Sequence, residues 1–490
     1  MAFVGYHNTG AIVLSSGSGD WRDVVTMVAD IAVMDEPTTG NFEIYGNRYL
    51  YITETAQLDD AGAYEDGSLT WATRTANGTS INIQYGGYLT VTSPGFILDF
   101  DLDAGATYAY MYVYGNCFIH GTALKPVIIK HYYRVRCWAN IDATGIIGMV
   151  DFDYVDFQSP SEYSPRTNSA FWLEDDNNLV TGGAAWRFTH ITLSNRTNGG
   201  YFFIASSGDW SRCVIEDITT DDTYYAAALE GVNMKFTRWV MRNVYSNMSL
   251  LGNGTGPGYP KTTVYADADR NVRNERQPKT TFDTCTFQDC NDSSSTGKRG
   301  LYGLRNTVVK LKACTFAGVD AVMNVGIDAR NGGRVLLQGG LAGQTWINVA
   351  AELYWYSRYD MGYYEVYELD LTVLDGAGSP LEGASVSVIH KGGNERHFFL
   401  TDANGNIKDC HDDDPVFVYG EILSNTPTYD LWSDGIGDKV HTITISHPDY
   451  TLDTREVAFT ENKTIVAQLT ETPAGATTIH GSTIYGSTIH

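Results

Sequence analysis

Acidic side chains gather at several places in this chain, and paired carboxylates are the groups that cleave polysaccharides by acid and base catalysis. If the chain is an enzyme of that kind, the candidate catalytic residues are Asp156, Glu174, Asp175, Asp176, Glu216 and Asp217. No arginine or histidine frames these clusters in the sequence. We therefore interpret them as solvated turns of an acidic protein, and a polysaccharide hydrolase or lyase is the alternative.

The segment VDFDYVDF holds two further carboxylates, Asp151 and Asp153. An unbroken strand would turn both of them to the same side as Val155 and Phe157, because alternate residues of a strand share a face. Burying two carboxylates in a core is costly. We therefore expect a bend or bulge between Tyr154 and Val155 that turns both carboxylates outward.

Three aspartates, Asp99, Asp101 and Asp103, alternate with Phe100 and Leu102 and so share one strand face. Like charges about 7 Å apart along a strand repel one another unless a cation or bound waters lie between them. We expect no cofactor, and Ca²⁺ is the alternative. The spacing resembles the start of an EF-hand loop. Ala104 stands at the glycine position, however, and no glutamate follows at the required distance. The HDDDP segment is a weaker metal candidate.

Aromatic residues make up 12% of the chain, which has 32 tyrosines. They serve either as strand formers or as exposed surfaces for binding, and both interpretations stay open. The candidate glycan-binding residues are Trp172, Tyr354, Trp355 and Tyr356.

Nine short sequence blocks recur along the chain and would position these side chains. Each block has two apolar residues separated by one other residue, and in most blocks a small or turn-forming residue follows. Five of the seven cysteines occupy the first apolar position of a block. The full set of these anchors is Cys117, Cys137, Val155, Ile191, Cys213, Trp239, Cys285, Cys314 and Val335. The steps between anchors cluster near ~20–25 residues, which is typical of a β-solenoid with one block in each coil. One coil has no recognisable block, and we expect Thr263–Asp267 to form it.

Inward thiols pack as small hydrophobic groups, so we expect the cysteines to be free. The alternative is a disulfide, because stacking would bring Cys117 within disulfide range of Cys137, and Cys285 within disulfide range of Cys314. The segment Asp20–Glu36 has an apolar stripe of helical period, with Asp20 as its N-cap, and we expect a helix that covers the open end of the solenoid.

The predicted fold class is all-β. It consists of a segment with the capping helix (1–40), a single-stranded, right-handed parallel β-helix (41–345), an aromatic connector (346–365), a β-sandwich (366–470) and a GSTIx repeat tail (471–490). The sandwich sequence contains GSPLEGASVSV, TDANG and ITISHPDY, and it resembles the carboxypeptidase regulatory-like, transthyretin-type domain. That resemblance implies an accessory module without catalytic residues.

The formal net charge of −25 argues against nucleic acid and against an anionic membrane surface. The first residues do not have the pattern of a signal peptide, and no run is apolar enough to insert in a membrane, so we expect synthesis in a cytoplasm.

In overall plan the chain resembles tailspike, fibre and decoration proteins of tailed bacteriophages. The resemblance implies a trimeric virion protein, made in the host cytoplasm, that contacts other virion proteins or a host surface glycan. A structural or adhesive role without catalysis is the favoured function. A polysaccharide-degrading tailspike and a cellular surface or filament protein are the alternatives.

Overall fold

A computed structural model describes the following residues, and nothing below concerns the rest. They are 4–8, 11–20, 42–44, 49–59, 68–70, 81–83, 87–92, 94–99, 110–130, 132, 134–138, 148–158, 169–174, 186–194, 201–205, 208–209, 213–221, 225–230, 232–242, 247–251, 280–290, 299–305, 308–318, 325–329, 334–349, 362–390, 396–408, 416–423 and 440–472.

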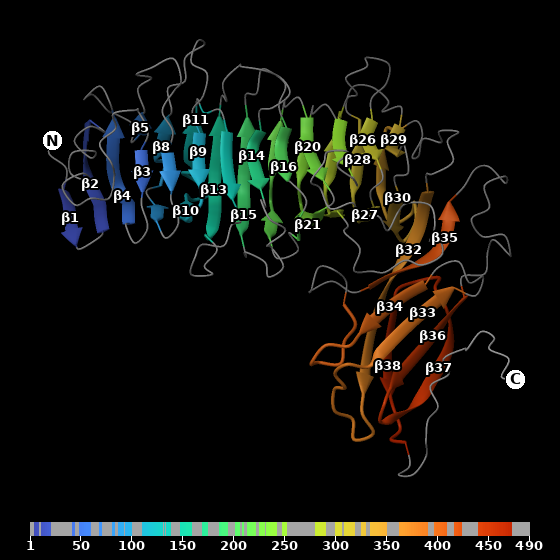
Figure 1. The fold of residues 1–490 in the computed structure, drawn as a ribbon. Helices are drawn as coiled ribbons and strands as arrows, with labels where there is room; N and C mark the ends of the chain where they lie inside the picture. Colours follow the sequence, from blue (N-terminus) through green and yellow to red (C-terminus); the bar gives the residue numbers. More distant parts are fainter. Residues whose placement is uncertain are drawn as a thin grey trace, which may run out of the picture.

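Most of the described strands pair in parallel and form three long ladders, in each of which one strand pairs with the equivalent strand of the next coil (Figure 1). The first ladder contains β4 (Tyr49–Asp59), β7 (Tyr88–Val91), β10 (Asn116–His120), β13 (Val150–Gln158), β15 (Arg187–Ser194), β18 (Val214–Glu216), β21 (Val232–Thr237), β24 (Thr280–Asp283), β27 (Val308–Lys312), β30 (Arg334–Gln338) and β32 (Gly362–Leu374).

The second ladder belongs to the same sheet. It contains β5 (Ser68–Thr70), β8 (Ile97–Asp99), β11 (Val127–Lys130), the later halves of β13 and β15, β19 (Thr219–Asp221), β22 (Val240–Arg242), β25 (Thr286–Gln288), β28 (Thr315–Ala317) and β31 (Thr345–Ile347). The short strand β17 (Gly208–Asp209) pairs with the start of β21.

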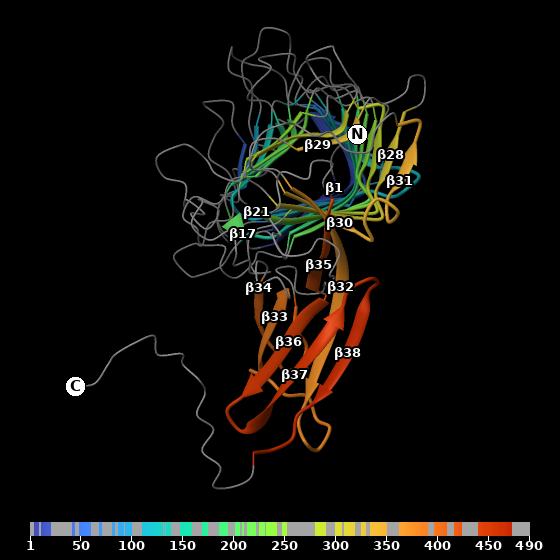
Figure 2. The same cartoon turned by 90° about the vertical axis from the view of Figure 1, so that its right-hand side faces the viewer.

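The third ladder is a separate ten-stranded sheet. It contains β3 (Phe42–Ile44), β6 (Ile81–Ile83), β9 (Tyr110–Val113), β12 (Arg134–Trp138), β14 (Ser169–Glu174), β16 (Tyr201–Ala205), β20 (Tyr225–Glu230), β23 (Asn247–Leu251), β26 (Arg299–Arg305) and β29 (Val325–Ala329). Viewed along the long axis, the ladders lie around a common interior (Figure 2). The described chain is therefore all-β with long parallel sheets compatible with a β-helix or solenoid, and the predicted fold class is confirmed at that level.

The beginning of the chain differs from the predicted division at residue 40. Strands β1 (Val4–Asn8) and β2 (Ala11–Asp20) form a hairpin, and β2 pairs in parallel with β4. Asp20, the predicted N-cap, is the last residue of β2. The described residues form no helix. Residues 21–41 lie outside the description, so the capping helix stays a prediction, as does the coil at 263–267.

The nine anchors are all buried, each at most 5% exposed, but they do not occupy one position of the coil. Cys117 lies in the first ladder, whereas Cys137 lies in the third and is the register partner of Val113. The single register predicted for the nine blocks is therefore wrong. Alternation of period two is the same in every strand of a coil, so a short block does not reveal its ladder.

A second correction concerns the predicted cysteine stacks. The register partners of Cys117 are Leu89 and Val150, so it does not stack on Cys137. Cys285 and Cys314 do occupy neighbouring coils, because the nitrogen of Thr315 donates to the oxygen of Cys285. All six described cysteines are free thiols, as predicted, and burial is the main reason why the pKa of Cys285 is raised.

Strand β32 continues from the parallel sheets into a second group of strands. It pairs with β30 at its start, then with β35 (Val416–Leu423) and with β38 (Lys463–Gln468). A four-stranded sheet faces these strands, in the order β34 (Arg396–Leu400), β33 (Ser385–His390), β36 (Val440–His447) and β37 (Tyr450–Ala458). Both sheets bury side chains in one core, among them Leu371, Val386 and Ile443. We call residues 366–472 the C-terminal module.

Candidate functional site

The first and second ladders meet at bends formed by residues with a positive φ. The bend residues are Tyr154, His190, Asp217, Arg238, Thr284 and Ala313, with φ between 48° and 56°. Such a residue reverses the alternation of side chains, so that a residue before the bend and a residue after it can share a face although their spacing is odd. In β13 the bend leaves Asp151 and Asp153 half-buried on the outer surface and Val155 inside, which confirms the predicted bend.

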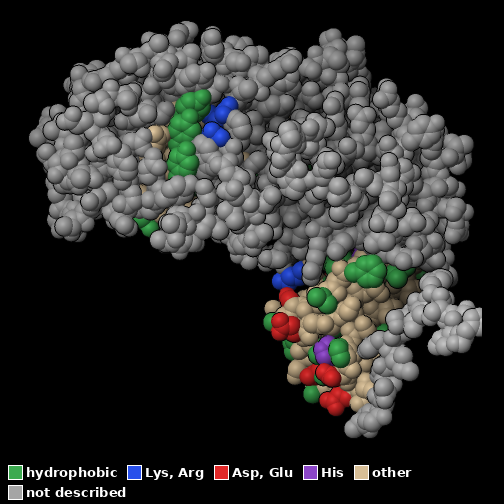
Figure 3. All heavy atoms as spheres, viewed as in Figure 1, with side chains coloured by type: hydrophobic (Ala, Val, Ile, Leu, Met, Phe, Trp, Pro, Cys, Tyr) green, Lys and Arg blue, Asp and Glu red, His purple; other side chains and the backbone are tan. Residues whose placement is uncertain are grey.

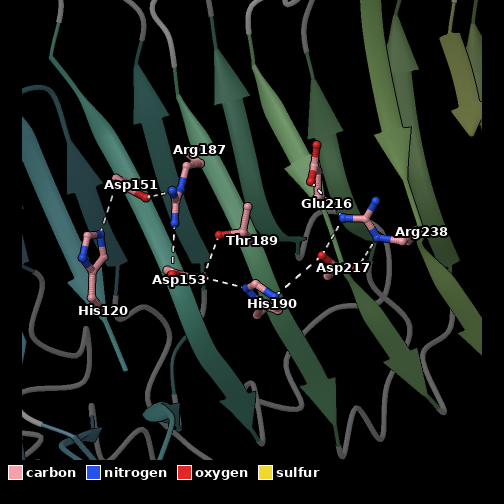
Figure 4. Close-up of polar contacts among 9 residues, drawn as sticks. All are labelled: His120, Asp151, Asp153, Arg187, Thr189, His190, Glu216, Asp217 and Arg238. Carbon is pink, nitrogen blue, oxygen red and sulfur yellow. Dashed lines mark hydrogen bonds and ion pairs between the residues drawn. The ribbon is translucent and has the colours of Figure 1, made fainter. Parts of the chain in front are cut away.

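A continuous set of ion pairs runs across the outer surface at four consecutive bends, and we call it the charged row (Figure 4). Its side chains come from the bend residues or from positions near them, and one comes from the preceding coil. Its members are His120, Asp151, Asp153, Arg187, His190, Glu216, Asp217 and Arg238.

One part of the charged row joins β10, β13 and β15. The Nε2 atom of His120 lies 3.1 Å from a carboxylate oxygen of Asp151, and Arg187 Nε donates to the other oxygen at 3.1 Å. Arg187 also reaches Asp153, with Nη2 3.0 Å from Oδ2. One guanidinium therefore bridges the two carboxylates of the neighbouring coil, which would otherwise repel each other.

His190 lies at the centre of the charged row. Its Nδ1 is 2.8 Å from Asp153 Oδ1, and its Nε2 is 3.7 Å from Asp217 Oδ2. Its ring stacks on the Tyr154 ring of the preceding coil, with centroids 4.0 Å apart and planes 7° apart. Thr189 donates a hydrogen bond of 2.7 Å to the same oxygen of Asp153. The His190 ring is therefore fixed on both edges and on one face.

Arg238 closes the charged row on the side toward the C-terminus. Its Nε and Nη2 donate to the two oxygens of Asp217 at 2.6 and 2.8 Å, and Nη2 also donates to Glu216 at 2.9 Å. Two parallel bonds between a guanidinium and a carboxylate are a strong form of ion pair. The hydrogen bond from Arg238 is the main cause that holds the pKa of Asp217 below its ordinary value.

The same outer face carries further pairs beyond Arg238. Asp283 lies 3.8 Å from the ammonium of Lys235 on one side and 3.8 Å from that of Lys312 on the other. Lys312 then reaches Glu368 of β32 at 3.0 Å. Charges of opposite sign thus succeed one another from coil to coil, as far as the start of the C-terminal module.

The charged row corrects one statement of the sequence analysis. Histidine and arginine do frame the acidic clusters, since His190 and Arg187 contact Asp153 and Arg238 contacts Glu216 and Asp217. These partners come from neighbouring coils and are far away in sequence. A signal was present, however: Tyr154, His190 and Arg238 each stand directly before the anchor in their blocks, which is the bend position.

The predicted catalytic candidates do not form one cluster. Glu216 and Asp217 lie together in the charged row, whereas Asp156 lies on the second ladder, where it accepts a hydrogen bond from Gln158. Glu174 is the last residue of β14 in the third ladder, and its side chain lies outside the description. Asp175 and Asp176 also lie outside the described residues, as do the glycan candidates Tyr354, Trp355 and Tyr356.

The pKa shifts in the charged row indicate whether its carboxylates can act as proton donors. Partial burial opposes ionisation of Asp153, but hydrogen bonds from His190 and Thr189 and the charge of Arg187 outweigh it, so the pKa of Asp153 is lowered. The pKa of Asp217 is lowered as well. A glycosidase acid must instead hold its proton near neutral pH, which requires a raised pKa. The row suits ionic pairing between coils better than proton donation.

The candidate Ca²⁺ site is only partly described. Asp99 ends β8, and its side chain is outside the description, as are Asp101, Asp103 and Asp412–Asp414. Within the described part of the chain, no group of three or more His, Cys, Asp and Glu side chains is arranged to hold a metal ion. Nor does that part contain a helix with the length and hydropathy of a membrane span.

Comparisons with protein-family models, with curated proteins and with solved structures found no match to the chain.

Proposed function

We propose that this chain is a structural or adhesive virion protein without catalytic activity, comparable to the tail fibres, spikes and capsid decorations of tailed bacteriophages. It would contact neighbouring virion proteins or host glycans. The observation that carries the proposal is the charged row. Its carboxylates, Glu216 and Asp217 among them, are held by arginine and histidine side chains of adjacent coils, so they serve the stack of coils instead of a substrate.

The path of β32 gives further support. This 13-residue strand pairs with β30 of the parallel sheets and then with β38 of the C-terminal module. One continuous strand therefore links the two parts, and the pair of Lys312 and Glu368 adds a contact at the junction. Figure 1 shows the long parallel region with the C-terminal module at one end. An elongated body with an attached module suits a role in spacing or presenting a binding surface.

The finer architecture is part of the proposal. The parallel sheets would form a right-handed β-helix capped by the helix predicted at 20–36. The C-terminal module would be a regulatory-like sandwich, and the GSTIx repeats at 471–490 would assemble three copies into a trimer. Tails of such low complexity become ordered when several chains wind together. The virion, reached from the host cytoplasm, would be its location.

The catalytic alternative can be tested directly. We would incubate the purified chain with a panel of capsular polysaccharides and measure both reducing ends and the ultraviolet absorbance of unsaturated products. No product is expected from the wild type. Product formation that either Asp217→Asn or Asp156→Asn abolishes would replace the proposal with the polysaccharide-degrading alternative.

The trimer is tested by mass photometry of the full chain and of a chain that ends at Thr470. We expect three copies in the first case and a shift toward one copy in the second. An unchanged mass distribution would remove the proposed role of the tail. The genes beside this one offer an independent check, because neighbouring capsid and tail genes would favour a virion protein over a cellular surface or filament protein.

A further inference from the structure

A strip of tyrosines lies on the outer face of the third ladder. In β9, Met111 and Val113 point into the core, whereas Tyr110 and Tyr112 alternate with them on the outside, and Tyr114 continues the strip past the end of the strand. The ring centroids of Tyr110 and Tyr112 are 4.8 Å apart, and those of Tyr112 and Tyr114 are 6.4 Å apart. The last two rings are stacked, with planes 17° apart. Three tyrosine rings thus lie in one row along the strand.

Two arginines of the next coil lie beside this row of rings. Arg134 and Arg136 of β12 are the register partners of Tyr110 and Tyr112. The guanidinium of Arg134 is almost fully buried and lies 6.0 Å from the centroid of the Tyr110 ring, a cation–π distance. Arg136 is half-buried. Figure 3 shows an apolar strip with arginine or lysine side chains next to it at the surface, over the part of the third ladder where β9 lies.

The two kinds of side chain favour one class of ligand. A tyrosine ring offers a flat apolar face with a polar tip, which suits the flat C–H face and the hydroxyl groups of a sugar ring. A guanidinium offers a rigid fork of donors that fits carboxylate and other oxyanion groups with two bonds. A saccharide that carries acidic groups presents both features at once. A nucleic acid fits less well, since it needs many basic contacts, and the described residues of this face offer two arginines, one of them buried.

We infer that the face formed by Tyr110, Tyr112, Tyr114, Arg134 and Arg136 binds an anionic saccharide. The sugar ring lies against the row of tyrosines, and Arg136 binds the acidic group. Arg134 packs over the Tyr110 ring and holds the row in place. This inference rests on the proposed adhesive function and names its ligand class. Trp172, predicted from the sequence as a glycan-binding residue, is the register partner of Arg136 in the following coil, and its side chain lies outside the description.

The test uses the full chain and immobilised polymers of three kinds: polygalacturonate for carboxylates, dextran sulfate for sulfates and dextran as the neutral polymer. Biolayer interferometry at neutral pH measures the dissociation constant for each. We expect the wild type to bind at least one anionic polymer at least tenfold more tightly than dextran. Tyr112→Ala and Arg136→Gln should each weaken that binding at least tenfold, and Arg136→Lys should fall between Arg136→Gln and the wild type because lysine keeps the charge without the fork.

Two matched controls lie away from the third ladder, on the outer surface of the first and second ladders. Tyr154→Ala removes a half-buried ring that is also part of a stacked pair, and Arg242→Gln removes an exposed arginine from β22. Both should leave binding within twofold of the wild type. Circular dichroism and the melting temperature verify the fold of each variant. If Tyr112→Ala does not fold, Arg136→Gln decides the test.

Three outcomes would overturn the inference: no binding to any of the polymers, equally tight binding to dextran, or binding that the Tyr112 and Arg136 variants leave within twofold. Failure of the proposed function looks different. Cleavage of a polymer that is bound through Tyr112 and Arg136 would retain the site and refute the non-catalytic role, whereas binding lost only in the control variants would retain adhesion and refute the site.

Discussion

The charged row of the parallel sheets and the Asp402 turn of the C-terminal module satisfy their carboxylates in different ways. In the parallel sheets a side chain finds its partner in another coil: Asp153 pairs with His190, and Asp217 with Arg238. At the Asp402 turn of the C-terminal module the partners belong to the same turn. Asp402 accepts hydrogen bonds from the backbone nitrogens of Asn404 and Asn406, at 2.8 and 2.9 Å. The first kind of partner requires the coil register, whereas the second requires only the local sequence.

The cores of the parallel sheets and of the C-terminal module also differ in how far their contacts extend. Inside the second ladder, aromatic rings stack from coil to coil, with the Phe316 ring 4.9 Å from Phe287 and 4.7 Å from Trp346. Each such residue contacts mainly its own and the adjacent coils, as in repeat proteins. The C-terminal module has one shared core, in which Phe399 packs among side chains from both sheets. We therefore expect damage to stay local in the first region and to spread through the second.

The largest effect should come from truncating one ring in each core. Phe316→Ala and Phe399→Ala should each cost about 3–5 kcal/mol of local stability, because each leaves a cavity. Hydrogen exchange measured by mass spectrometry should show faster exchange in β25, β28 and β31 for Phe316→Ala, with β7 and β10 unchanged. For Phe399→Ala the whole C-terminal module should exchange faster. Uniform acceleration along the parallel sheets would contradict the local picture.

The next effect concerns a turn of the C-terminal module. Gly405 has φ +75°, and a Cβ there would lie 2.3 Å from the backbone oxygen of Val373. Gly405→Ala should therefore cost about 3 kcal/mol, from left-handed strain and from this clash. Gly378 is the matched control, since it has φ +87° but no atom within 4 Å of the added Cβ. Gly378→Ala should cost only about 1–2 kcal/mol in urea unfolding. Equal losses would show that the close approach is unimportant.

A smaller effect separates the two kinds of polar partner. Asp217→Asn should cost about 1 kcal/mol or less, and 1 M NaCl should reduce that loss by screening the pair with Arg238. Asp402→Ala should cost about 1 kcal/mol with a smaller salt dependence, because two of its partners are backbone N–H groups and its only charged partner among the described residues, Lys408, lies 3.5 Å away. Urea unfolding at low and high salt measures both. The same salt dependence for both variants would remove the distinction.

The pH dependence of Asp217→Asn has a defined sign. The pKa of Asp217 is lowered in the folded chain, so its contribution is complete above the ordinary carboxyl pKa of about 3.9 and is lost as the pH falls through the lower, folded value. The stability difference between wild type and variant should therefore stay constant from pH 7 to about pH 5 and disappear in stronger acid. A difference that grows as the pH falls would contradict the ion pair.

The smallest effect is a stabilisation at a bend. Ala313 is exposed and has φ 48°, which costs an L-residue about 1–2 kcal/mol, whereas glycine adopts it freely. After the entropy lost by glycine is subtracted, Ala313→Gly should stabilise the chain by about 0.5 kcal/mol. Ala317→Gly, in strand β28 of the same coil, should destabilise it by about 0.5–1 kcal/mol. Urea unfolding of the two variants should therefore give changes of opposite sign.

Particular residues show how far the sequence could be interpreted. The bend at Tyr154 was predictable because an unbroken strand would have buried Asp151 and Asp153, which is too costly. The burial of Cys285 and Trp239 followed from alternation alone. The ladder to which Cys137 belongs was not predictable, because all strands of a coil share that alternation. The tyrosine strip of β9 was also missed, since its arginines come from the next coil.

The sequence by itself determined which residues face inward, where Tyr154 must bend the chain, and that the fold is all-β with long parallel pairing. These features depend on neighbours in the chain and on the cost of burying charge. Only the tertiary structure decided that His190 lies between Asp153 and Asp217 and that Arg136 lies beside Tyr112. Those contacts depend on the register between coils, and loops of unequal length separate the coils, so the spacing in sequence does not fix the spacing in space.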